Sequence, residues 1–282
     1  MNWELLQNGL VIALNGSAML AMGLALPVSS VLHSVREISP LIRGLIVNLL
    51  ITPLIAWLLT YGFQFSAAAA LGLMICAAAP GGNTGPLLSS NAKGNLAYAV
   101  TQVIILSFAS LITVPLFLEL LGTGEGMDIP VLRILTLIGL FHIFPLVLGM
   151  LGHHWKPGLA HSWSRYFRIL ANVCLVALTV LLLWLKGETL IANGWKPALA
   201  MGIFVIALLL LGFAAGKSPG HIRSLSMTTS TRNLSLSLLL GAQVFPEPGT
   251  MMAILTYGLL WVCITVPLSF WLGSRAASSA QG

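Results

Sequence analysis

Long apolar stretches, separated by short polar ones, run along almost the whole chain. A helix needs about 20 apolar residues to cross the hydrocarbon core of a bilayer. The pattern predicts nine membrane-spanning helices, at Gly9–Leu26, Gly44–Gly62, Ala67–Ser90, Ala97–Leu121, Val131–Leu151, Phe167–Leu185, Pro197–Ala215, Ile222–Phe245 and Thr250–Leu272. The third and the eighth are less apolar than the others. We therefore predict an all-α integral membrane protein in which residues 1–282 form a single polytopic domain.

The composition agrees with a chain that lies in lipid. Of the 282 residues, 57% are hydrophobic and only 7% are charged, whereas a soluble domain has roughly 25% charged residues. The net charge of +6 does not indicate a nucleic-acid partner, because the basic residues fall mainly in loops, where they set the orientation of the helices. The cysteines Cys76, Cys174 and Cys263 are too far apart for a Cys-x-x-Cys metal site, and we expect no cofactor.

The basic residues also predict the orientation in the membrane. Nine Lys and Arg residues, Arg168 among them, fall on one side of the predicted helices and three fall on the other. Cytoplasmic loops carry the excess of basic residues. We therefore predict a multi-pass protein of the plasma (inner) membrane, with the N-terminus outside and the C-terminus in the cytoplasm.

One short sequence occurs twice. Ile112–Leu116 and Ile264–Leu268 both read Ile-Thr-Val-Pro-Leu, each at the end of a span, and 32 residues upstream of them lie Pro80 and Arg232, each in a polar, weak span. The two copies are five spans apart, so they cross the membrane in opposite directions. This spacing predicts an inverted-topology repeat, with a first copy over 1–121 that lacks its first helix and a second over 131–275. Many secondary transporters are organised in this way.

Both weak spans are polar, and the first has the composition of an interrupted helix. Pro80 removes a hydrogen-bond donor, and the glycines that follow it weaken the helix. Unwound backbone at membrane depth is tolerated only where it is buried in protein or lines a watery cavity. The candidate binding residues are therefore those at the two interruptions, Pro80, Gly81, Gly82, Asn83 and Thr84 in the first and Thr228, Ser230, Thr231, Arg232 and Asn233 in the second. The alternative is an ordinary kink packed against its neighbours.

Several of these segments together resemble the bile acid:sodium symporter family. The resemblance rests on Met22–Leu26, on Asn48 five residues before Pro53, on Pro80-Gly81-Gly82 followed by Lys93-Gly94-Asn95, on Phe144–Gly149 and on Arg232-Asn233. It covers most of the chain in the right order. It implies a core domain with two broken, crossing helices, a separate panel domain, and transport of organic anions together with sodium.

The chain departs from the family at the positions that the resemblance connects with sodium. Thr228 stands where the family has a Glu, Arg232 where it has a Gln, and Gly85-Pro86 where it has Ser-Asn. Asn48 keeps an amide in place of a Gln. A residual sodium site would consist of Asn48, Thr228 and Thr229, and the resemblance leaves sodium coupling open.

Arg232 and His142 lie well inside predicted spans, and Arg232 has no evident acidic partner there. All seven acidic residues fall in loops or near span ends. Arg232 either replaces a bound sodium ion, or binds the anionic group of the substrate bidentately, or donates to carbonyls freed near Pro80. A lone buried histidine such as His142 is either a hydrogen-bonding residue or a proton carrier.

These observations predict a secondary active transporter of a small organic anion, either bile-acid-like or another carboxylate or sulfonate, that works without sodium. An arsenite-efflux carrier is the alternative, with Cys76 one helical turn before Pro80, and a non-transporting sensor on the same fold is another. The chain lacks the motifs of intramembrane or serine hydrolases, so we predict that it is not an enzyme. The expected partners are the anion and the lipid bilayer, with no nucleic acid and no obligate protein partner.

Overall fold

A computed structural model describes residues 3–25, 38–121, 129–192 and 195–278, and all regular elements in these ranges are helices. In chain order they are α1 (Trp3–Ala25), α3 (Ile38–Ile46), the π-helical segment η1 (Val47–Ile51), α4 (Thr52–Gly62), α5 (Ala67–Ala78), α6 (Gly85–Asn91), α7 (Leu96–Leu121), α8 (Val131–Leu137), the π-helical segment η2 (Ile138–Ile143), α9 (Phe144–Trp155), α10 (Pro157–Ala192), α11 (Trp195–Ala215), α12 (Pro219–Ser230), α13 (Leu234–Gln243) and α14 (Pro248–Ser278).

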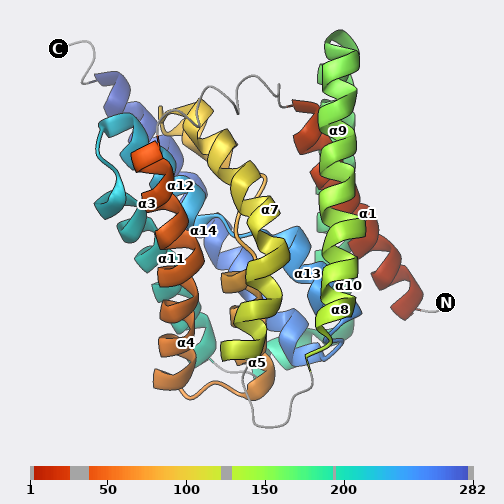
Figure 1. Ribbon diagram of the computed structural model, residues 1–282. Coiled ribbons are helices and arrows are strands. Elements are labelled where there is room, and N and C mark those ends of the chain that lie inside the picture. The colour runs from red at the N-terminus through yellow and green to blue at the C-terminus, as the bar shows by residue number, and fades with distance from the viewer. Residues whose placement is uncertain (1–2, 26–37, 122–128, 193–194, 279–282) are drawn as a thin grey trace.

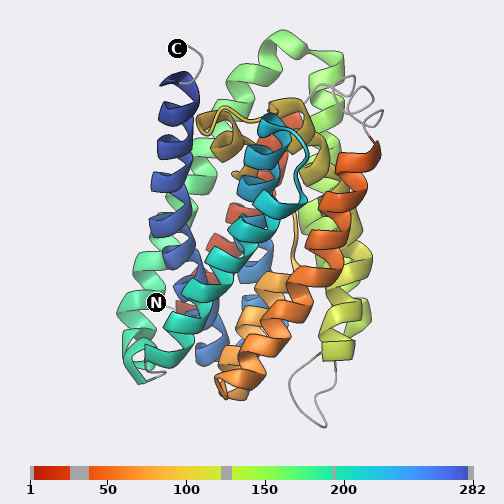
Figure 2. The same cartoon turned by 90° about the vertical axis from the view of Figure 1, so that its left-hand side faces the viewer.

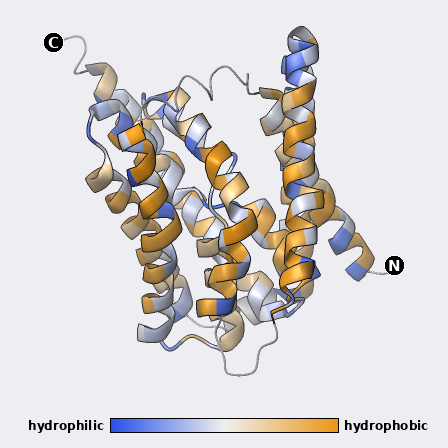
Figure 3. Cartoon of the chain, viewed as in Figure 1, coloured by the Kyte–Doolittle hydropathy of each residue, from blue (hydrophilic) through white to orange (hydrophobic). Residues whose placement is uncertain are grey.

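Seven helical stretches in the described residues are long and apolar enough to cross a membrane. Each matches one of the nine predicted spans, although Leu26, the predicted end of the first, lies outside the described residues. Large apolar side chains are exposed on their outer surfaces, for example Leu132 at 78% and Tyr61 at 79%. Figure 3 shows hydrophobic colour over most of the long helices and hydrophilic colour at helix ends, such as the N-terminal end of α1. This surface fits lipid.

The remaining two predicted spans, the third and the eighth, are interrupted. α5 ends at Ala78 and α6 begins at Gly85, while α12 ends at Ser230 and α13 begins at Leu234. The first interruption follows from Pro80, because the residue before a proline is disfavoured in the α conformation. At the second, Asn233 accepts a hydrogen bond from the Leu236 amide at 3.1 Å and so caps the start of α13. The interruptions predicted from the sequence are therefore present.

The helices form two groups (Figure 1). We call α1, α8, η2, α9 and α10 the panel, because α1 packs closely along both α9 and α10. We call the other helices the core. Figure 2, turned by 90°, shows α14, α11 and the α3–α4 helix side by side on the outer face of the core. Panel and core meet mainly where α1 packs on α13 and where α10 packs on α14.

Several helices extend beyond the predicted spans. α10 begins at Pro157, ten residues before the predicted start at Phe167, so the predicted loop containing Arg165 is helical. α14 continues to Ser278, six residues past the predicted end at Leu272. The spans are predicted from apolar stretches, so polar residues at the end of a long helix are assigned to a loop.

Two glycines allow α1 and α9 to approach closely. A Cβ atom on Gly23 would collide with the carbonyl oxygen of Leu146 and would lie 2.9 Å from the Cα atom of Gly149. Small residues at helix contacts are the usual means of tight packing in membranes, where apolar surface alone gives no preference for protein over lipid.

We expect Gly23→Ala to destabilise the panel by roughly 1–3 kcal/mol, the usual cost of overpacking a tight contact. The measurement is the apparent melting temperature of the purified protein in detergent. Gly16→Ala is the matched control on the same helix, because a Cβ atom there would meet no atom within 4 Å. Equal melting temperatures for the two variants would contradict the close approach.

Candidate substrate- and ion-binding site

The two interruptions lie against each other and are hydrogen-bonded. The Gly82 amide donates to the Thr231 carbonyl at 3.3 Å, and the Asn233 amide donates to the Ala79 carbonyl at 3.0 Å. These bonds satisfy backbone groups that would otherwise be orphaned where the helices unwind. Segments about 150 residues apart in sequence thus form one crossing point in the core.

Glycine is required on the first side of this crossing point. Gly81 has a φ of +80°, in the left-handed region that other residues rarely adopt. A Cβ atom on Gly82 would lie 2.6 Å from the Arg232 carbonyl oxygen and 2.7 Å from the Thr231 Cγ2 atom. The two chains can therefore approach only because these side chains are absent.

The Arg232 guanidinium binds the end of α5. The side chain is 3% exposed. Its Nε donates to the Cys76 carbonyl at 3.2 Å and its Nη2 to the Ala77 carbonyl at 2.5 Å. Its Nη1 donates to Asn48 Oδ1, on η1, at 2.8 Å. The last carbonyls of a helix have no partner within it, so Arg232 acts here as a cap on α5. Of the three roles considered for it, this geometry corresponds to donation to freed carbonyls.

Asn48 and Thr229 belong to the same cluster, whereas Thr228 does not. Asn48 Nδ2 donates to Thr229 Oγ1 at 3.1 Å. The Thr228 hydroxyl instead lies 2.8 Å from the Ser224 carbonyl and 3.0 Å from Gln102 Oε1. The expected sodium set of Asn48, Thr228 and Thr229 is thus divided between two places.

The place around Asn48 does not fit a sodium ion. Sodium needs several oxygen atoms with free lone pairs, but Asn48 Oδ1 is bound by the cationic Arg232 side chain at 2.8 Å. On the other side, a Cβ atom on Gly85 would lie 3.3 Å from Thr228 Cγ2 and 3.6 Å from Val103 Cγ2. The side-chain atoms nearest to the Gly85 position, where the resemblance places a serine, are therefore methyl carbons.

Ser230 and Thr231 lie inside the helix bundle. Both are fully buried, and both hydroxyls donate to the Met227 carbonyl of their own helix, at 3.0 and 2.7 Å. These two hydroxyls thus satisfy their own backbone, which is the common behaviour of Ser and Thr in helices.

A cleft of about 370 Å³ lies between the panel and the first interruption. Asn83 and Thr84 line it on the core side, and Ser164, Arg168 and Asn172 of α10 line it on the panel side. Apolar side chains, including Met22, Leu87 and Val100, complete the wall. Of the binding residues predicted from the sequence, only Asn83 and Thr84 border this cleft.

Arg168 is the residue that the sequence interpretation missed. From the sequence, Arg168 is interpreted only as a basic residue that sets the orientation in the membrane. It lies in α10, and its exposed side chain lines the cleft. The spacing of Ser164, Arg168 and Asn172, four residues apart each time, puts them on one helix face. That spacing was visible in the sequence, but only if the helix was known to begin at Pro157.

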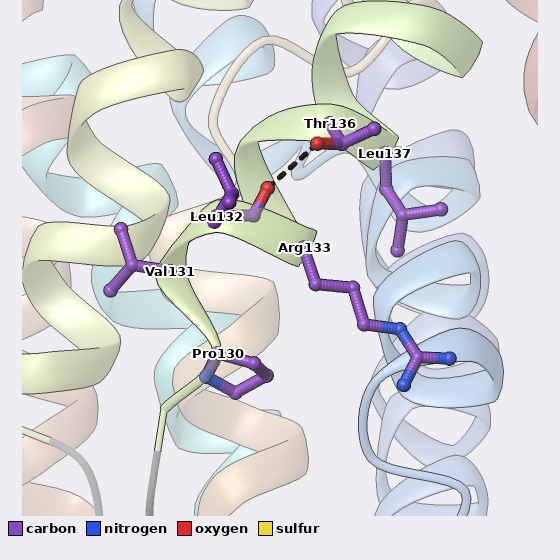
Figure 4. Close-up of a pocket in the computed structure, with 6 residues that line it drawn as sticks. All are labelled: Pro130, Val131, Leu132, Arg133, Thr136 and Leu137. Atoms are coloured by element: carbon purple, nitrogen blue, oxygen red, sulfur yellow. Dashed lines mark hydrogen bonds between the residues drawn. The ribbon is translucent and has the colours of Figure 1, made fainter.

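A second hollow, of about 590 Å³, lies on the surface at the start of α8 (Figure 4). All six lining residues belong to α8 or to Pro130 directly before it. The Thr136 hydroxyl donates to the Leu132 carbonyl of its own helix at 2.8 Å. Because one helix face provides the whole wall and Leu132 is 78% exposed, we interpret this hollow as part of the outer surface.

Comparisons with known proteins agree with this architecture. The sequence profile of the "Sodium Bile acid symporter family" matches residues 11–193. A rice protein, "Probable sodium/metabolite cotransporter BASS2, chloroplastic" from Oryza sativa subsp. japonica, is 26% identical over 83% of this chain and 56% of its own length. Human "Sodium/bile acid cotransporter 4" is 24% identical over 69% of this chain and 46% of its own length.

A bacterial protein, "Uncharacterized sodium-dependent transporter YocS" of Bacillus subtilis (strain 168), is 28% identical over 48% of this chain and 42% of its own length. The chain spans about half the length of the curated relatives it matches. The family profile, by contrast, matches well over half of the chain itself. The chain therefore belongs to the sodium bile acid symporter family, a family of membrane transporters and not of enzymes.

Proposed function

We propose that the protein is a secondary transporter that carries a small organic anion across the membrane without sodium. The observation that carries the proposal is the cleft beside the first interruption, which has one exposed guanidinium, Arg168, among mostly apolar walls. A cavity of about 370 Å³ has the size of small-molecule sites. An arginine binds a carboxylate or sulfonate by two parallel hydrogen bonds, and the apolar wall accepts the rest of the molecule.

The two interrupted segments complete nine spans if each is counted as one crossing. Residues 1–121 and 131–275 then form the inverted repeat, with the N-terminus outside the plasma membrane. In such transporters the substrate site lies beside discontinuous helices, and one group of helices moves against the other to expose it on each side in turn. The cleft between panel and core fits that movement.

Sodium independence rests on Arg232. A sodium ion held about 4 Å from a guanidinium would be repelled by about 4 kcal/mol even at an effective dielectric constant of about 20. The guanidinium already supplies a fixed positive charge to the Cys76 and Ala77 carbonyls. In this proposal Arg232 therefore does the work that a bound sodium ion does in relatives, and the substrate anion binds elsewhere, at Arg168.

An arsenite carrier is less well supported. Arsenite transport would need an accessible thiol near the site, but Cys76 is fully buried. Its own carbonyl oxygen is used by Arg232. The test is uptake into proteoliposomes of labelled cholate, benzoate, ethanesulfonate and arsenite, with sodium and proton gradients imposed separately. Uptake of arsenite alone would contradict the proposal.

We expect Arg168→Gln to raise the KM for the anion at least tenfold while changing the maximal rate much less. A hydrogen bond to a charged group contributes about 1.5–3 kcal/mol, and about 1.4 kcal/mol corresponds to a factor of ten. The measurement is the concentration dependence of uptake. Arg165→Gln is the matched control, because Arg165 is exposed on the same helix but does not line the cleft. An unchanged KM in the Arg168 variant would remove Arg168 from the site.

A further inference from the structure

His142 joins the panel to the crossing point of the core. It lies in the π-helical segment η2 and is fully buried. Its Nδ1 lies 3.3 Å from Asn15 Oδ1 on α1, and its Nε2 lies 3.4 Å from Asn233 Nδ2 at the second interruption. Asn233 Nδ2 also lies 3.4 Å from the Gly81 carbonyl of the first interruption. Single π-helical turns inside α-helices occur often at functional sites.

The neighbouring hydrogen bonds determine which ring nitrogen carries the proton. Asn15 Nδ2 donates to the Phe141 carbonyl at 2.8 Å, so Asn15 turns its oxygen toward His142. Asn233 Oδ1 accepts from the Leu236 amide at 3.1 Å, so Asn233 turns its NH2 group toward the ring. His142 is therefore neutral in this conformation, with the proton on Nδ1 and a lone pair on Nε2.

A second proton on His142 would break the contact with the core. It would place an N–H on Nε2 opposite the NH2 group of Asn233, and two donors at 3.4 Å repel. Asn233 cannot turn its oxygen toward the ring without losing the cap of α13, which contributes about 1 kcal/mol. The His142–Asn233 contact and the second proton thus exclude each other.

No charged group among the described residues compensates for that proton. The helices packed against η2 carry the ionisable residues Glu4, Tyr98, Glu119, Arg133, His153 and His154. Arg232 is the ionisable residue directly before Asn233. Arg133 is nine residues from His142, roughly 13 Å along the helix, and Glu4 and Glu119 lie in the first and last turns of their helices. Arg232 directs its guanidinium to α5 and Asn48.

We propose that His142 is the site of a coupling proton, neutral when panel and core touch as here and protonated when they separate. This inference rests on the proposed function. The Gly81 carbonyl bound by Asn233 lies two residues before Asn83, which lines the cleft. An imidazolium there favours binding of an anion in the cleft. One proton therefore moves with each monoanion in the same direction, so that no net charge is transported. The proton leaves His142 when the His142–Asn233 contact re-forms, and it is released to the side to which the cleft opens.

The transport test uses ethanesulfonate as well as cholate and benzoate, because a strong acid does not cross protein-free liposomes in its neutral form. A gradient of one pH unit should accumulate the anion about tenfold at one proton per anion. His142→Gln should lose this accumulation but keep exchange of labelled for unlabelled anion in the absence of gradients, since a glutamine oxygen can accept from Asn233 and does not titrate. His154→Gln, on an exposed histidine, should accumulate like the unmodified protein. Accumulation by His142→Gln would overturn the proposal.

A second measurement needs no substrate. Hydrogen exchange at the Asn233 and Leu236 amides should be faster at pH 5 than at pH 8, after correction for the intrinsic rate, because the proton on His142 frees Asn233. His142→Gln should remove this difference. Asn15→Asp should shift the transition to higher pH, because a carboxylate beside Nδ1 stabilises the imidazolium. Hydrogen exchange that does not depend on pH in the unmodified protein would overturn the inference. If hydrogen exchange at the Asn233 amide depends on pH but the protein exchanges no anion, the proposed function is overturned instead.

Discussion

Replacing Gly82 by valine should abolish transport and leave a folded, membrane-inserted protein. Even the Cβ atom of the new side chain would lie 2.6 Å from the Arg232 carbonyl oxygen. The valine methyls would add to this clash and would separate the Gly82 amide from the Thr231 carbonyl that it now binds at 3.3 Å. The crossing point could no longer close, so the cleft beside it would lose its shape. The measurement is exchange of labelled anion in proteoliposomes.

The control for this variant is Gly202→Val on α11, where a Cβ atom meets no atom within 4 Å. It should transport normally. Both variants should elute as single species in detergent, because the substitutions lie in or beside helices that the rest of the bundle holds in place. Normal transport by Gly82→Val would mean that the first interruption is an ordinary kink.

The first interruption could be predicted from the sequence because its cause is local. Pro80, Gly81 and Gly82 disfavour a helix wherever they stand, and α5 ends two residues before Pro80. The second interruption contains neither proline nor glycine, so it could be predicted only from its spacing to the repeated Ile-Thr-Val-Pro-Leu sequence. Asn233 explains it afterwards, since its side chain caps α13 at 3.1 Å.

The partners of the polar residues could not be predicted, because they come from distant parts of the chain. Arg232 binds carbonyls at Cys76 and Ala77, more than 150 residues away. Thr228 and Thr229 are neighbours in sequence, yet one contacts Gln102 and the other Asn48. Adjacent residues on a helix point about 100° apart, so a list of candidate residues from one segment spreads over several surfaces.

Uptake by the unmodified protein should not change when sodium is replaced by potassium on both sides of the membrane. The names of two relatives include sodium, so this prediction is the one that distinguishes this protein from them. Its physical basis is that Asn48 Oδ1 already accepts a hydrogen bond from the cationic Arg232 side chain at 2.8 Å. Steep sodium dependence would mean that Asn48 and Thr229 bind sodium and that Arg232 turns away from them.

Arg232→Gln should then lower transport at least tenfold, because it leaves the buried Cys76 and Ala77 carbonyls without their charged donor, at a cost of about 1.5–3 kcal/mol each. Arg232→Lys should rescue little, since a single ammonium cannot reproduce a planar guanidinium that contacts three oxygens. Arg223→Gln on the preceding helix α12 is the control, because that side chain is only partly buried and binds a loop carbonyl.

Adding Thr228→Glu to Arg232→Gln tests whether the arginine stands in for an ion. The new carboxylate would replace the Thr228 side chain beside Gly85 as the repelling guanidinium is removed. Sodium should then stimulate the double variant but neither single variant, because only the double variant both adds a negative charge and removes the guanidinium. Stimulation of Thr228→Glu alone would show that Arg232 does not exclude the ion, and the charge-replacement role would have to be given up.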